Sequence, residues 1–156
     1  MIVVAVVVLA GYVIIAFSMA SDHYYSKTVA NGGLQGGSGT TGKSNGTNRA
    51  KIVGGTPVFV AYKAEEMLGA KKVCASIGLE NNAGGKLTVE SGGPVITLST
   101  GSQSTSFGTA YRAGGFNDIC QDIDGVFATI SSNYGARVSV TRTSGDIKVK
   151  EIWIER

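Results

Sequence analysis

The sequence is poor in the residue types that most catalytic and metal sites require. It contains one histidine, His23, and two cysteines, Cys74 and Cys120, which form no CxxC pair. A Ser-His-Asp triad is excluded in the region after residue 50, because that region has no histidine. The absence of a CxxC pair argues against zinc and thiol-redox motifs. We therefore expect no enzyme activity, no cofactor and no bound metal.

Charge is also scarce. Charged residues make up 16% of the 156 positions, the net charge is +3, and the lysines and arginines are scattered along the chain. Nucleic-acid binding would need a basic face or stripe, so we expect no nucleic-acid partner. Asp118, Asp122 and Asp124 lie close in sequence, but their spacing does not match that of a calcium loop.

The N-terminal segment has no charged residue before Asp22. A helix of 20 residues is about 30 Å long, the thickness of the hydrocarbon layer. Apolar residues would surround such a helix on all sides, so we predict a membrane or filament-core helix over residues 1–31. The large apolar residues assigned to this core are Ile2, Val3, Val4, Val6, Val7, Val8, Leu9, Val13, Ile14, Ile15 and Phe17.

Three interpretations of this segment compete. Ser18 to Ala20 loosely fits a signal-peptide cleavage site, but no Lys or Arg precedes the apolar run, as such signals require. The segment can instead be a single-span anchor. It can also be a helix that lies first in the membrane and later in the core of a polymer, where Gly11 and Ala16 would let helices approach closely. Composition alone does not separate the last two interpretations.

The remainder divides into two parts. Residues 32–49 are rich in Gly, Ser and Thr and cannot bury a core, so we predict a flexible linker. Residues 50–156 are predicted to form a globular α+β domain with an antiparallel sheet packed on one or two helices. The predicted helices cover 60–73 and 117–134, and the predicted strands cover 86–91, 94–100, 105–113, 136–143 and 146–155.

A turn at Ser144-Gly145 is expected to join the last two strands as a hairpin. The alternation of apolar and polar residues in these strands predicts the buried face of the sheet. That face is predicted to contain Val138, Val140, Ile147, Val149, Ile152 and Ile154.

The two cysteines allow two states. A disulfide is plausible if the domain lies outside the cytoplasm, and the apolar N-terminus argues that it does. Two buried free thiols are the alternative. The only bridge that one chain can form is Cys74–Cys120.

Two stretches, LENNAGGKLTVES and SFGTAYRAGGFNDICQDIDGVFATI, resemble the globular part of type IVb pilins, especially the thin-pilus major pilins of plasmid conjugation systems. In that family a strand follows an asparagine and a Gly-Gly pair. Here the asparagine corresponds to Asn81 or Asn82, the pair to Gly84-Gly85 and the strand to residues 86–90. A later helix carries a cysteine in its first turn, which corresponds here to Cys120. The apolar N-terminus also fits the family.

The resemblance implies a structural subunit of a type IV pilus-like filament that polymerises through its N-terminal helix and serves conjugation or adhesion. Its partners would be identical subunits, the inner membrane before assembly and the pilus assembly machinery, and its location the bacterial cell surface. We expect subunit contacts around Tyr134 and Trp153. The alternatives are a single-span membrane-anchored extracytoplasmic binding protein, or a minor pilin or pseudopilin.

Overall fold

The computed structural model describes the backbone of residues 2–9, 12–19, 23–37, 40–44, 47–52, 55–91, 102–108 and 115–156, and the side chains of 23–37, 50–52, 55–91, 102–108 and 115–156. Within these residues the chain is mainly β-strand, with two short helices. In chain order the elements are β1 (Ile2–Leu9), β2 (Tyr12–Met19), β3 (Tyr24–Thr28), β4 (Gln35–Gly36), β5 (Thr40–Ser44), β6 (Thr47–Ile52), β7 (Val58–Tyr62), α1 (Ala64–Met67), β8 (Lys72–Ser91), β9 (Ser102–Phe107), β10 (Phe116–Asp122), α2 (Gly125–Tyr134) and β11 (Ala136–Glu155).

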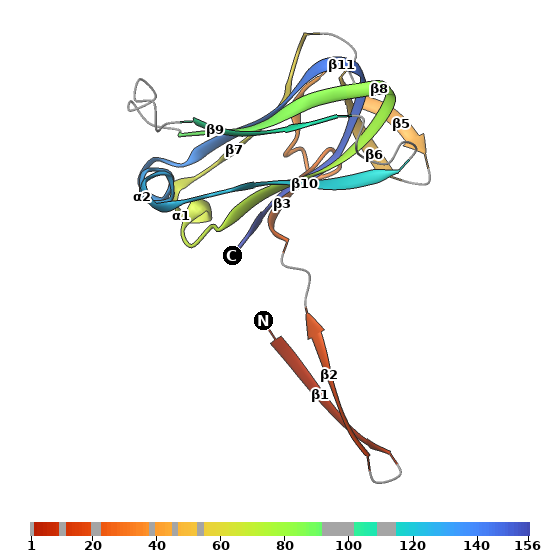
Figure 1. Ribbon diagram of the computed structural model, residues 1–156, viewed down its shortest axis with the longest axis vertical. Coiled ribbons are helices and arrows are strands. Elements are labelled where there is room, and N and C mark those ends of the chain that lie inside the picture. Colours follow the sequence, from red (N-terminus) through yellow and green to blue (C-terminus); the bar gives the residue numbers. More distant parts are fainter. Residues whose placement is uncertain are drawn as a thin grey trace.

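Strands β8 and β11 organise the fold. They pair antiparallel along nearly their whole length, from Ala136 opposite Ser91 to Glu155 opposite Lys72. Each half of β8 has its own second partner, since β10 pairs with the first half and β9 with the second. The first part of β11 pairs with β7, and its last part pairs with β6 and β3. The two long strands therefore belong to two layers, and Figure 1 shows them curving over from one layer to the other.

We call the layer that contains β4, β7, the start of β11, the end of β8 and β9 the first layer. The second layer contains β10, the start of β8 and the end of β11, with β3, β6 and β5 beside them. The two layers form a β-sandwich. Each strand alternates side chains between its two faces, so one face of each layer faces the other layer and one faces outward.

The bend between the layers depends on unusual backbone conformations. Asn81 and Asn82 in β8 have φ values of 55° and 54°, and Gly145 in β11 has φ of 60°. The register of the ladder shifts on both sides of Ser144. A Cβ atom at Gly145 would lie 2.5 Å from the Cα of Ala83, so only glycine fits this crossing.

The core lies between the layers and is mainly aliphatic, with the aromatic rings of Tyr62, Phe107 and Phe127 among the aliphatic side chains. The six residues predicted to form the buried face, from Val138 to Ile154, are all fully buried, so that prediction is confirmed. Met67 of α1 and Phe127 of α2 are also buried, and they close the end of the sandwich where the two helices lie (Figure 1).

The predicted N-terminal helix over residues 1–31 is wrong. β1 and β2 pair as a separate two-stranded antiparallel sheet, and residues 24–28 form β3. β-Branched Val and Ile dominate this segment and favour strands over helices. In the parts of the chain described above, no helix combines the length and the apolar character that crossing a bilayer requires. The side chains of the assigned core residues, from Ile2 to Phe17, lie outside those described.

The predicted α+β class is also wrong, because most of the predicted helical residues form strands. β10 occupies Phe116–Asp122, and α2 begins only at Gly125 after Asp124 as its N-cap. The predicted end of this helix before Gly135 is confirmed. The helix predicted over 60–73 is reduced to the single turn of α1. A short apolar run fits both the helical period of 3.6 residues and the strand period of 2. Residues 116–122 form a strand because they pair with the long strand β8.

Other predicted boundaries also differ from the structure. The two strands predicted to form a hairpin at Ser144-Gly145 are one continuous strand, β11, that bends there. Residues 32–49, predicted as a linker, contain β4, β5 and the first residues of β6. The strand predicted over 94–100 lies outside the described residues.

Replacing Gly145 by alanine should strongly destabilise the protein. A left-handed backbone costs an alanine about 1–2 kcal/mol, and overpacking against the Ala83 backbone adds about 1–3 kcal/mol. Gly69→Ala is the matched control, because Gly69 also has positive φ (75°) but a Cβ atom there would have no neighbour within 4 Å. Urea unfolding should show a larger loss for Gly145→Ala. Equal losses would show that the crossing at Ala83 tolerates a side chain.

Candidate functional site

The outward side of the first layer carries mostly polar side chains, and we call it the outer face. The strand register aligns these side chains in rows. One row runs through Ala61, Arg137, Glu90 and Ser102. The next runs through Phe59, Ser139, Thr88 and Ser104. The alternation with buried valines on the same strands explains why these residues point to solvent.

A pocket of about 420 Å³ lies at the end of this outer face where α2 runs into β11. The residues that line it include the aromatic Phe59 and Tyr134 and the charged Glu90 and Arg137. Tyr62 also borders it, but the Tyr62 ring is buried in the core. The guanidinium of Arg137 lies over the ring of Phe59, with 4.4 Å between the Cζ atom and the ring centre. Such a cation–π contact is worth about 0.5–1 kcal/mol at an exposed site, and it keeps the N–H donors of Arg137 beside the pocket.

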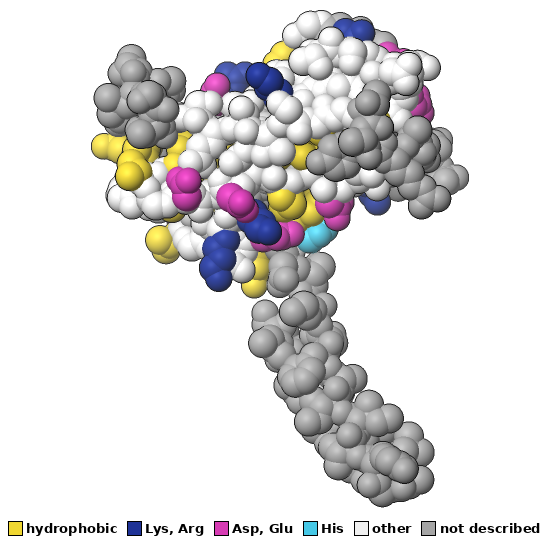
Figure 2. Space-filling view, in the orientation of Figure 1, with side chains coloured by type: hydrophobic (Ala, Val, Ile, Leu, Met, Phe, Trp, Pro, Cys, Tyr) yellow, Lys and Arg dark blue, Asp and Glu magenta, His cyan; other side chains and the backbone are white. Residues whose placement is uncertain are grey.

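The end of α2 places Tyr134 at this pocket. The helix ends at Gly135, which has φ of 79° and whose N–H donates to the carbonyl of Ser131. A Cβ atom at Gly135 would lie 2.4 Å from the carbonyl oxygen of Tyr62, so glycine allows the helix end to approach β7 closely. Figure 2 shows hydrophobic side chains on the surface at the end of the molecule where α1 and α2 lie. Tyr134 is 51% exposed.

Tyr62 connects the pocket to the second layer. Its ring is buried, and its hydroxyl donates a hydrogen bond of 3.1 Å to the carbonyl of Ile152 across the sandwich. Burial raises the pKa of this phenol far above its usual range, and the negative charges of Glu66 and Glu151 raise it further. The phenol is thus held inside the core as a neutral hydrogen-bond donor that joins the two layers.

A second cluster lies on the outward side of the second layer. His23 stacks on Trp153 with 3.9 Å between the ring centres, and its Nδ1 atom lies 3.0 Å from Glu151. The register places Trp153 opposite Cys74, and Cys74 opposite Cys120. These two cysteines form a disulfide.

The two residues predicted at a subunit interface lie far apart in the architecture. Tyr134 is at the end of α2 beside the outer face of the first layer, whereas Trp153 is in the second layer. Trp153 is only 1% exposed. The structure does not bring these two aromatic side chains together into one surface.

Sequence reasoning missed Phe59, Glu90 and Arg137 as site residues. The signal for Phe59 was present in VFVAY, where buried and outward-facing residues alternate along β7. Assigning residues 60–73 to a helix hid this alternation. Glu90 and Arg137 lay in correctly predicted strands, but only the β8–β11 register shows that they are neighbours.

No family model and no curated protein matches the chain. Several solved structures share its fold. A carbohydrate-binding module of the β-sandwich superfamily, studied for promiscuous specificity, has a TM-score of 0.59 at 12% identity and covers 93% of this chain and 67% of its own. The xylan-binding module CBM15 has a TM-score of 0.52 at 13% identity, covering 79% of this chain and 90% of its own.

A third structure, the xylanase Xylanase10C from Cellvibrio japonicus in complex with xylopentaose, has a TM-score of 0.52 at 12% identity. The likeness covers 79% of this chain but only 27% of that enzyme. At these identities the comparisons establish the fold alone, which is a β-sandwich of the kind found in carbohydrate-binding modules.

This fold overturns the resemblance to type IVb pilins, which are built on a long N-terminal helix. None of the described residues form such a helix. The functional predictions that depended on the resemblance are therefore wrong as well. They are the pilus-like filament of identical subunits, the inner-membrane stage before assembly and the assembly machinery as a partner. Two of the three similar structures are binding modules, and the third is a xylanase of which only part resembles this chain.

The buried phenol of Tyr62 predicts a specific loss of stability in alkali. Above about pH 10 the unfolded chain loses this proton while the folded chain keeps it, so the free energy of unfolding falls by about 1.4 kcal/mol per pH unit. Tyr62→Phe should remove this share of the slope while costing about 1 kcal/mol at neutral pH for the lost hydrogen bond. Urea unfolding between pH 9 and 11.5 measures both effects.

Tyr134→Phe is the control for this experiment, because the Tyr134 side chain is half exposed in the folded chain. It should keep the wild-type slope. If Tyr62→Phe also kept the wild-type slope, the phenol of Tyr62 would not be held neutral by burial.

Proposed function

We propose that this protein is a non-catalytic carbohydrate-binding module that binds a glycan at the pocket on the outer face of its first layer. The observation that supports it most is the pocket itself, where aromatic and charged side chains converge on the surface of a β-sandwich. The fold shared with carbohydrate-binding modules makes a sugar the ligand to test first.

The chemistry of the pocket suits a sugar ring. A pyranose has an apolar face of C–H groups and an edge of hydroxyls. The rings of Tyr134 and Phe59 offer apolar surface, and Arg137 and Glu90 offer hydrogen-bond donors and acceptors beside it. The pocket volume of about 420 Å³ is within the range of small-ligand sites.

The rows of the outer face extend this site beyond the pocket. The hydroxyls of Ser139, Thr88 and Ser104 lie in the row next to Arg137 and Glu90, on three neighbouring strands. Each hydroxyl can both donate and accept a hydrogen bond. A glycan with one sugar ring in the pocket would therefore continue across these strands, with its hydroxyls bonded to those of the protein.

Catalysis is not part of this proposal. Glycoside hydrolysis generally requires a pair of carboxyl groups on either side of the scissile bond. Among the described residues that line the pocket, Glu90 is the only carboxylate. We also propose a location outside the cytoplasm, because the Cys74–Cys120 disulfide persists in oxidising compartments.

The proposal is tested by measuring binding to soluble xylan, cello-oligosaccharides and other plant and bacterial polysaccharides by affinity electrophoresis and calorimetry. Tyr134→Ala removes exposed aromatic surface from the pocket and should weaken binding at least about tenfold, or about 1.4 kcal/mol. Tyr25→Ala is the matched control, because Tyr25 is similarly exposed (41%) but belongs to β3 in the second layer.

Binding that is unchanged by Tyr134→Ala but lost in Tyr25→Ala would move the site to the second layer. An absence of binding to every glycan in the panel would reject the proposed function.

A further inference from the structure

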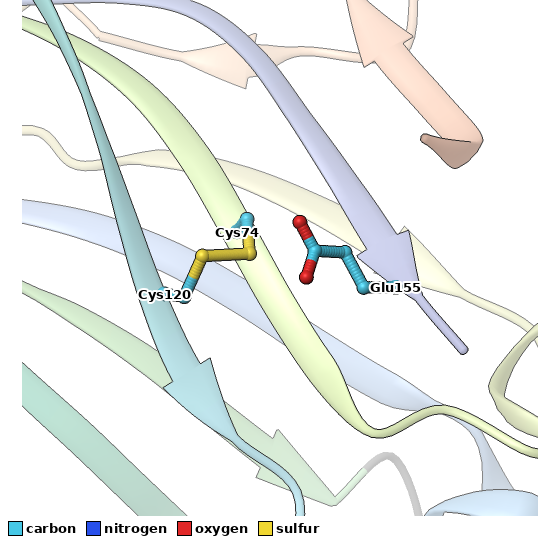
Figure 3. Close-up of side chains that lie close together, drawn as sticks. All are labelled: Cys74, Cys120 and Glu155. Atoms are coloured by element: carbon cyan, nitrogen blue, oxygen red, sulfur yellow. A yellow bond between two sulfur atoms is a disulfide. The ribbon is translucent and has the colours of Figure 1, made fainter. Parts of the chain in front are cut away.

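The carboxylate of Glu155 lies beside the disulfide on the outward side of the second layer. Figure 3 shows it directed toward the sulfur atoms of Cys74 and Cys120. One carboxylate oxygen and the two Sγ atoms all lie within 4.8 Å of one another. Glu155 Oε1 also accepts a hydrogen bond of 3.3 Å from the indole N–H of Trp153.

The strand register explains why these groups converge. Cys120, Cys74 and Trp153 are direct neighbours across β10, β8 and β11, and their side chains share one face. Glu155 follows Trp153 by two positions, so its side chain lies on that same face. Three rigid strands thus hold the two sulfur atoms, the carboxylate and the indole in place.

We propose that Cys74, Cys120 and Glu155 bind a single zinc ion whenever the two cysteines are reduced. The newly made chain carries both cysteines as thiols, and a dithiol or phosphine reductant regenerates them by adding two electrons and two protons to the S–S bond. Zinc then displaces one proton from each thiol and forms two Zn–S bonds and one Zn–O bond. A small-molecule disulfide that takes up two electrons and two protons, and leaves as two thiols, re-forms the Cys74–Cys120 bond and releases the ion.

The ligand set and its spacing fit zinc. Zn–S bonds of about 2.3 Å and a Zn–O bond of about 2.0–2.2 Å place tetrahedral ligand atoms roughly 3.5–3.8 Å apart. In the disulfide the two Sγ atoms are bonded to each other, so they must move apart by rotation of the cysteine side chains after reduction. The carboxylate oxygen of Glu155 already lies within 4.8 Å of both sulfur atoms. Water would take the fourth position, and the Trp153 N–H would orient the carboxylate from outside the ligand shell.

Zinc binding leaves the net charge of the site unchanged relative to the disulfide form. Zinc binds cysteine as the thiolate, so binding to the reduced protein releases protons. A zinc ion with two thiolates and one carboxylate carries a net charge of −1, the same as the carboxylate beside the neutral disulfide. The metal-bound state therefore adds no net charge to this part of the surface.

The test uses the full chain in its oxidised form and after anaerobic reduction with a phosphine. Zinc binding is measured by competition with a chromophoric chelator, and cobalt(II) serves as a spectroscopic probe of thiolate ligation. The reduced protein should bind one zinc per chain and show thiolate-to-cobalt charge-transfer absorption. The oxidised protein should bind at least about a hundredfold more weakly, because its sulfur atoms are no longer thiolate ligands.

Glu155→Gln should lower the zinc affinity of the reduced protein at least about tenfold while leaving the disulfide able to form. Glu80→Gln is the matched control, because Glu80 is a carboxylate on β8 that pairs with Lys148 away from the cysteines. Equal zinc affinity in reduced Glu155→Gln and reduced wild type would overturn the site. The same result is expected if reduction unfolds the chain and zinc binds only to the exposed thiols, so this outcome also counts against the proposal. Absence of zinc binding by the reduced protein would do the same. Neither measurement involves a sugar, so the outcome is independent of the proposed carbohydrate binding.

Discussion

The antiparallel pairing of β8 with β11 is the constraint on which the rest of the molecule depends. Both strands run through both layers, and every other strand of the sandwich attaches to one of them directly or through one intermediate strand. The bend that allows this is made by left-handed residues in β8 and by Gly145 in β11. The β8–β11 pairing sets the register of the strands in each layer. It therefore also determines which side chains align in rows on the outward surfaces.

The register set by the β8–β11 pairing places different side chains on the two outward surfaces of the sandwich. On the first layer the register aligns hydroxyls, one cation–π pair and an open pocket, which suits reversible contact with a polar ligand. On the second layer it aligns a disulfide, a covered indole and several carboxylates. A ligand on one surface is separated from the other surface by an aliphatic core, so the two sites are expected to act independently.

The sequence predicted strands well where polar and apolar residues alternate. Val138, Val140, Ile147 and Val149 were placed correctly on the buried face, because a period of two is unambiguous over such a length. The sequence pattern predicted the wrong element where apolar residues follow one another without clear alternation. The N-terminal Val-rich run reads equally as a buried helix, and the β10 segment around Ile119 fits a helical stripe as well as a strand.

The candidate site could be predicted only in part, because it is made by pairing between distant segments. Tyr134 was predicted to make subunit contacts, but nothing in the sequence places it beside Phe59 or shows that Arg137 lies opposite Glu90. Likewise, the approach of Glu155 to the cysteines follows from a register that spans more than half of the chain. Periodicity reports which face a residue occupies, whereas a site depends on which residues share that face.

β11 is the last strand of the sandwich in chain order, and this affects how the domain folds during synthesis. β3, β6, β7 and β8 are all synthesised before the strand that holds them together. The sandwich therefore cannot close until β11 has left the ribosome, and until then the apolar faces of the earlier strands are not covered. Folding that depends on such distant contacts is slow, which makes this interval the time at which the nascent chain is most exposed to aggregation and most in need of a chaperone.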